Sequence, residues 1–172
     1  MTAPTVSPFT VFPQGPGQPI DNLTGLINRQ AKGLGVVGSA TVAADDYKIG
    51  VIKITTGTVT NSPSGTGTVS LYLALSEDGV TFTDGLDPNS QDGAGQANIL
   101  SVTSQSLATM LIQRINTPAS NTMYMFNAFS LKQKLGFYVP TFFGIYVANT
   151  SNGQLSTVAA NFLAGYKVIT PN

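Results

Sequence analysis

The segment Val69-Ser-Leu-Tyr-Leu-Ala-Leu75 decides the fold class. Every second residue in it is a branched aliphatic residue, and the residues between are Ser, Tyr and Ala. This period of two is typical of a β-strand with one buried face, so residues 69, 71, 73 and 75 are expected in the core. The following Ser76-Glu-Asp-Gly79 contains an Asp-Gly pair that favours a tight turn. Val80 and Phe82 resume the alternation, which predicts a β-hairpin.

The same alternation recurs in short segments throughout residues 34–169, separated by polar turns. Further strands are expected over residues 97–104, 107–115, 122–129, 141–148 and 161–169. Near residue 50 the apolar positions change phase, from Tyr47, Ile49 and Val51 to Ile52 and Ile54. The change indicates either a bulge or a strand buried on both faces. Residues 130–136 predict one helical turn, begun by Ser130 and ended by Gly136. We therefore expect an all-β protein, an antiparallel β-sandwich or jelly roll.

The N-terminal residues differ in composition, since half of the ten prolines lie within the first nineteen positions. Proline favours extended backbone, so residues 1–33 are expected to form an extended arm, with residues 34–172 as the sandwich domain. A short helix over residues 21–33 fits Asp21 as its N-cap and Gly33 as its end. Two interpretations of the arm remain open, a frayed terminus and a segment that docks in a groove.

Apolar side chains along the arm favour docking on a partner. The candidate partner-binding residues there are Phe9, Val11, Phe12 and Ile20. Because a segment interrupted by proline cannot form a central strand, removal of residues 1–20 is expected to weaken assembly without lowering the melting temperature.

The segment Phe137–Val147 has the highest density of aromatic residues and is apolar on both faces. Either it is a central strand covered on both sides, or one face, which includes Phe142 and Tyr146, meets another subunit. These two residues complete the candidate partner-binding set.

Several kinds of chemistry are excluded by composition. The chain has no Cys, His or Trp, so it can form no disulfide, thiolate nucleophile, imidazole metal ligand or histidine-dependent triad. Its carboxylates lie in turn contexts, which is why we expect no enzyme, no catalytic residues and no cofactor. Asp84, Asp87, Asn89 and Asp92 gather oxygen ligands in one loop, but their spacing misses the EF-hand pattern. We assign no metal; whether this loop binds a cation or caps its own backbone stays open.

The surface must be poor in charge, since 9% of the 172 residues are charged and the formal net charge is zero. Such a chain creates little long-range electrostatic field that would attract nucleic acid or an anionic membrane. We therefore expect neither as a partner. The longest apolar candidate, Phe137–Ala148, is too short for a membrane span. Low surface charge also defends weakly against self-association, which favours a homo-oligomer.

Three segments carry a resemblance to a protein class: Leu73-Ala-Leu-Ser-Glu-Asp-Gly-Val-Thr-Phe-Thr-Asp-Gly85, Ser130-Leu-Lys-Gln-Lys-Leu-Gly136, and Gly144-Ile-Tyr-Val-Ala-Asn-Thr150 preceded by Pro140. Over roughly residues 69–168 the chain resembles small β-sandwich virion proteins of tailed bacteriophages. The resemblance implies a capsid decoration or cement protein, made in the host cytoplasm and located in the virion. Its partners would be the major capsid protein or other virion proteins. The alternatives are a tail, neck or fibre component and a glycan-binding recognition module.

Overall fold

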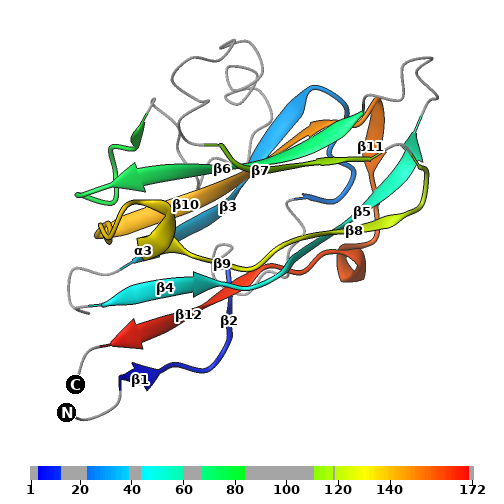
Figure 1. The fold of residues 1–172 in the computed structure, drawn as a ribbon. Coiled ribbons are helices and arrows are strands. Elements are labelled where there is room, and N and C mark those ends of the chain that lie inside the picture. The colour runs from blue at the N-terminus through cyan, green and yellow to red at the C-terminus, as the bar shows by residue number, and fades with distance from the viewer. Residues whose placement is uncertain are drawn as a thin grey trace.

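The computed structural model describes residues 4–12, 23–38, 44–59, 67–83, 111–117 and 119–170. The chain is an all-β protein in which antiparallel sheets form two layers that pack face to face (Figure 1). This confirms the predicted fold class. Ile20, the loop from Asp84 to Asp92 and the strand expected over residues 97–104 lie outside the described residues.

The first layer is one sheet of four antiparallel strands. In spatial order its strands are β3 (Gln30–Gly38), β10 (Phe142–Thr150), β6 (Thr68–Ser76) and β7 (Leu111–Asn116). Ile145 of β10 pairs with Leu73 of β6, and every residue of β10 from 143 to 149 is buried. The part of the aromatic-rich segment from Phe142 onward is therefore a central strand buried on both faces, whereas Phe137 and Tyr138 lie before it and are exposed.

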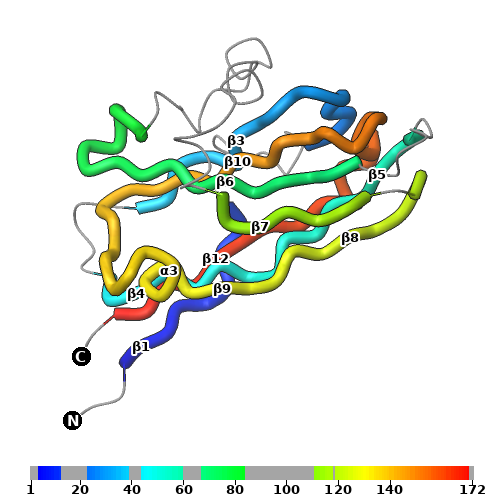
Figure 2. Tube along the Cα trace, turned by 45° about the horizontal axis from the view of Figure 1, so that its top comes forward, coloured from blue at the N-terminus to red at the C-terminus, as the bar shows by residue number. Residues whose placement is uncertain are grey.

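The second layer consists of two sets of antiparallel strands (Figure 2). One part contains β1 (Thr5–Val6), β2 (Thr10–Val11), β12 (Gly165–Thr170), β4 (Asp46–Ile49) and β9 (Phe129–Ser130). The other part contains β11 (Gly153–Leu155), β5 (Ile52–Val59) and β8 (Met123–Phe126). A short helix α3 (Leu131–Lys134) and a 3-10 turn η3 (Ala159–Asn161) complete the elements described.

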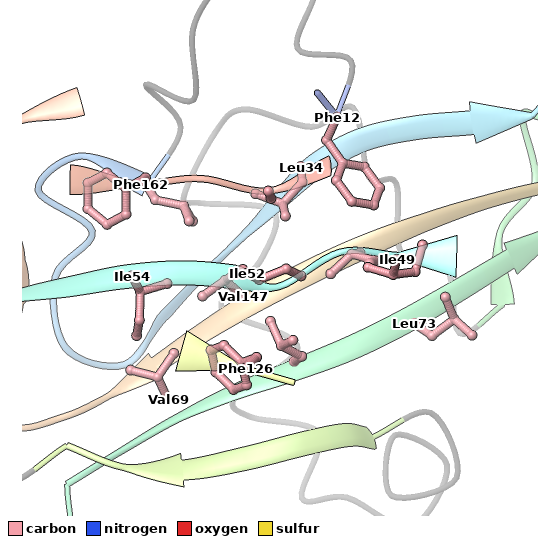
Figure 3. Close-up of a cluster of buried hydrophobic side chains, with 14 of the residues drawn as sticks. Phe12, Leu34, Ile49, Ile52, Ile54, Val69, Leu73, Phe126, Val147 and Phe162 are labelled. Atoms are coloured by element: carbon pink, nitrogen blue, oxygen red, sulfur yellow. The ribbon is translucent and has the colours of Figure 1, made fainter. Parts of the chain in front are cut away.

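Strand β6 confirms the alternation from which the fold class was predicted. Val69, Leu71 and Leu73 are buried in the core between the layers, and Leu75 is half-buried against it. Apolar side chains from both layers meet there, as Figure 3 shows for Ile49, Ile52 and Val147.

The phase change near residue 50 is an interruption between two strands. β4 ends at Ile49 and β5 begins at Ile52, so the two residues between them restore the inward direction of the side chains. Tyr47, Ile49, Ile52 and Ile54 all reach the core, whereas Val51 is exposed. Of the two interpretations, the bulge-like break is the one observed.

The predicted helical turn forms as expected. The Ser130 hydroxyl accepts a hydrogen bond from the backbone N–H of Gln133, and Gly136 ends the turn with φ of +66°. Left-handed backbone of this kind is the usual glycine conformation after a helix.

The predicted hairpin is only partly correct. The turn after Ser76 forms, but residues 80–83 form no strand. The backbone N–H groups of Val80 and Thr81 both donate to Oδ1 of Asp78, at 2.8 and 2.7 Å. Because the carboxylate takes these donors, they are not available for a strand ladder.

The expected division of the chain at residue 33 is also wrong, because it falls inside β3. The expected helix over residues 21–33 is replaced by a turn at Leu23 and the start of β3 at Gln30. Gly25 and Arg29 both have φ of 64°, which a continuous right-handed helix does not allow. Leu23 and Leu26 are buried in the core, so this part of the chain belongs to the sandwich.

Candidate interaction surfaces

The carboxylates in the described part of the chain lie apart from one another or have structural partners. No three Asp or Glu residues gather there in a way that would hold a metal ion. The buried Asp46 has a structural role: it accepts hydrogen bonds from the Ser130 hydroxyl at 2.7 Å and from the Lys132 backbone N–H at 2.9 Å. Among the described residues, exposed apolar side chains form the surfaces considered next for contact with a partner.

Residues 4–12 of the N-terminal arm are part of the second layer. β1 and β2 pair with β12, and between them the Ser7 N–H donates to the Val168 carbonyl while the Val168 N–H donates to Ser7 Oγ. Phe12 is buried and packs edge-on against Phe143. Residues 4–12 thus contribute to the fold.

Phe9 lies against two glycines, Gly50 between β4 and β5 and Gly165 at the start of β12. A Cβ atom on Gly50 would be 2.7 Å from the Phe9 ring, and one on Gly165 would be 2.3 Å from it. Real Cβ atoms do not approach so closely, so both positions require glycine for the ring to sit there. Val6, Phe9 and Val11 remain 52, 44 and 47% exposed, and we call these three residues the arm surface.

The candidate partner-binding residues therefore have different positions. Phe9 and Val11 are exposed on the arm surface. Phe12 and Tyr146 are interior, at 2 and 1% exposure, and cannot contact a partner on the surface of this chain. Phe142 is half-buried, and its ring lies 3.2 Å from where a Cβ on Gly79 would be, beneath the turn that follows β6.

A second exposed group lies on β5, β8 and the segment before β12. Met125 pairs with Lys53, and Leu163 bridges to Lys53 from the other side. Their neighbours Ile52 and Phe126 point into the core, so these side chains point outward. Lys53, Met123, Met125 and Leu163 form what we call the methionine surface, on which Met123 and Met125 are 53 and 59% exposed.

A third group lies at the end of the first layer, where the turn after β6 meets the segment before β10. Val80 is 80% exposed, and Tyr138 lines a groove of about 550 Å³ beside this turn. The remaining lining residues are Leu75, Ser76, Glu77, Asp78, Thr81, Phe82 and Thr83. We call Val80, Tyr138 and the groove the turn end.

Another groove, of about 680 Å³, lies at the β9 edge of the second layer. Phe137 borders it with φ of 73° and is 79% exposed. The charges in this groove are of both signs, and Lys132 and Asp45 pair across 2.6 Å. This groove therefore has no clear preference for a charged partner.

Sequence reasoning did not identify the methionine surface or the turn end. The alternation in Met123-Tyr-Met-Phe126 was a usable signal for the former, since it places both methionines on one face. No sequence pattern indicated the groove of the turn end, because it forms where two segments that are distant in the chain come together.

Comparison of the chain with known protein families, with curated proteins and with solved structures gives no match. Among the described residues, none of the helices has the length and apolar character needed to cross a bilayer.

Proposed function

We propose that the protein is a phage virion structural protein, a capsid decoration or cement protein that attaches to neighbouring virion proteins through the arm surface. The observation that carries the proposal is the position of Phe9. Its ring rests on Gly50 and Gly165 yet remains 44% exposed, so an aromatic side chain is held ready for contact. Aromatic residues held in this way are frequent anchors of protein interfaces.

The proposed mechanism is mass action on an assembled lattice. A subunit that binds only the assembled form stabilises that form by its binding free energy. Repeated sites on a lattice also increase the effective concentration of a bridging subunit, so each contact can be weak. A surface with few charges suits this role because apolar and backbone contacts then dominate the interface.

The test is co-sedimentation of the purified protein with phage particles that lack it. Wild type should bind in hundreds of copies per particle, and the variant Val6→Asp/Val11→Asp should bind about tenfold more weakly or worse. Ile27→Asp is the matched control, because Ile27 is 50% exposed and lies outside the arm surface.

Binding in a few to some dozens of copies would instead indicate a tail or neck component. Absence of binding to any part of the particle would reject a virion role.

A further inference from the structure

The turn end is held rigidly. Asp78 Oδ1 accepts from the Ser76 hydroxyl at 2.8 Å and from the N–H groups of Val80 and Thr81. The Gly79 N–H donates to Ser76 Oγ, and the Phe142 ring supports Gly79 from below. Val80 therefore projects into solvent from a fixed turn, and little conformational entropy remains to be lost when it is buried by a partner.

The charge of the turn end is negative. Glu77 and Asp78 are the charged residues that line its groove, and the other lining residues are apolar or carry hydroxyl groups. Hydrogen bonds from the backbone amides of Thr81 and Val80 and from the Ser76 hydroxyl keep the pKa of Asp78 well below its usual range. The groove thus combines apolar walls with two carboxylate side chains, of which that of Asp78 stays ionised near neutral pH.

The methionine surface has the complementary properties. Lys53 lies between Met125 and Leu163, and its Nζ donates to the Ala160 carbonyl at 3.1 Å. Among the residues described, it forms no ion pair with a carboxylate. Methionine side chains are flexible and polarizable, so they adapt to an irregular groove.

The two surfaces cannot meet within one copy of the protein. The turn end follows β6 in the first layer, whereas the methionine surface lies on the side of β5 and β8 that faces away from the core (Figures 1 and 2). We propose that the turn end of one copy binds the methionine surface of a second copy, with Met125 against the groove and Lys53 facing Glu77. This is a head-to-tail contact, which builds a ring or an open chain of copies.

Two variants, each blocked at one of the surfaces, test the contact. Val80→Asp disables the turn end and Met125→Asp disables the methionine surface, and both positions are exposed, so both variants should fold. Sedimentation velocity over a concentration series should show that wild type associates. Each variant, measured by itself, should stay monomeric, because its dissociation constant for self-association rises about tenfold or more. A 1:1 mixture of the two variants should form dimers and nothing larger, because each variant retains one intact surface.

Charge exchange gives a second measurement. Glu77→Lys and Lys53→Glu should each weaken association, and the double variant should recover it. Ile27→Asp is the control and should associate like wild type.

The proposal is wrong if wild type stays monomeric, if either blocked variant associates like wild type, or if the mixture forms no dimer. The contact gives the proposed structural protein one partner, a second copy of itself. Its test uses the purified protein alone, without phage particles. The variant Val6→Asp/Val11→Asp should lose particle binding and still self-associate, so the failure of one proposal can be distinguished from the failure of the other.

Discussion

Leu73 illustrates how single side chains hold the two layers together. It is 3% exposed, pairs with Ile145 of the central strand, and faces the second layer with Val69 and Leu71. A side chain in this position is surrounded by atoms from several strands, so its removal leaves a cavity that the backbone cannot easily fill.

Leu73→Ala should lower the free energy of unfolding by about 2–5 kcal/mol. Denaturant titration at constant m-value measures the change. Val80→Ala serves as the comparison, because Val80 is 80% exposed and its truncation should cost little. Equal effects from the two substitutions would show that the face of β6 is assigned wrongly.

The buried Tyr47 and the half-buried Tyr166, which packs against the core, make the free energy of unfolding depend on pH in the alkaline range. Burial raises the pKa of Tyr47 above its ordinary 10.0, with a further contribution from the nearby Tyr166, and burial also raises the pKa of Tyr166. Above about pH 10 the unfolded chain releases these protons first, so the folded state binds more protons than the unfolded state.

The free energy of unfolding should therefore decrease as pH rises through and above about 10, and Tyr47→Phe should reduce this decrease. Thermal unfolding at several pH values from about 8 to 11 measures both slopes. A Tyr47→Phe variant with the slope of wild type would mean that this phenol does not titrate differently in the two states.

Helix α3 depends on one hydroxyl group that joins three elements. Ser130 Oγ accepts from the Gln133 N–H at the start of α3 and donates to Asp46 of β4. The hydroxyl that caps the helix therefore also donates a hydrogen bond to a buried carboxylate. This second bond attaches the short helix to the second layer.

Ser130→Ala should cost about 1–2 kcal/mol, because both the cap and a hydrogen bond to a buried charged group are lost. Ser130→Thr keeps the hydroxyl and should recover most of the stability. If alanine and threonine destabilise equally, the loss comes from packing and not from these hydrogen bonds.

At the scale of the whole molecule, the N-terminal residues connect the two layers. Phe12 contacts Phe143 of the first layer and Tyr166 of the second, at ring-centre distances of 6.4 and 5.4 Å. The arm therefore joins both layers, and the backbone of β12 would lose its partners β1 and β2 without it.

Removal of residues 1–12 should lower the melting temperature, contrary to the expectation from proline content. Phe12→Ala alone should cost about 3–5 kcal/mol, and Phe9→Ala should cost less, because Phe9 is half-exposed. Calorimetry of the truncated chain, Phe12→Ala and Phe9→Ala measures these losses and shows whether Phe12→Ala costs more than Phe9→Ala. A truncated chain that melts like wild type would show that Phe12 does not contribute to the core in solution.

The sequence by itself determined the features that depend on neighbouring residues. The period-two pattern identified β6 and its buried face, and the apolar faces of residues 137–147 gave a central strand, observed as β10, as one of two interpretations. Ser130 and Gly136 marked the ends of the helical turn. Each of these signals is local, because backbone geometry alternates side chains along a strand and caps act within one turn.

Only the tertiary structure decided where the arm belongs and which apolar side chains remain exposed. The prolines near Phe12 favoured an arm outside the fold, yet Phe12 is buried in the core, where its ring contacts Phe143 of β10 and Tyr166 of β12. Glycines at positions 50 and 165, far apart in the chain, together make room for Phe9. Burial depends on which distant segments meet across the two layers, and no pattern within one segment contains that information.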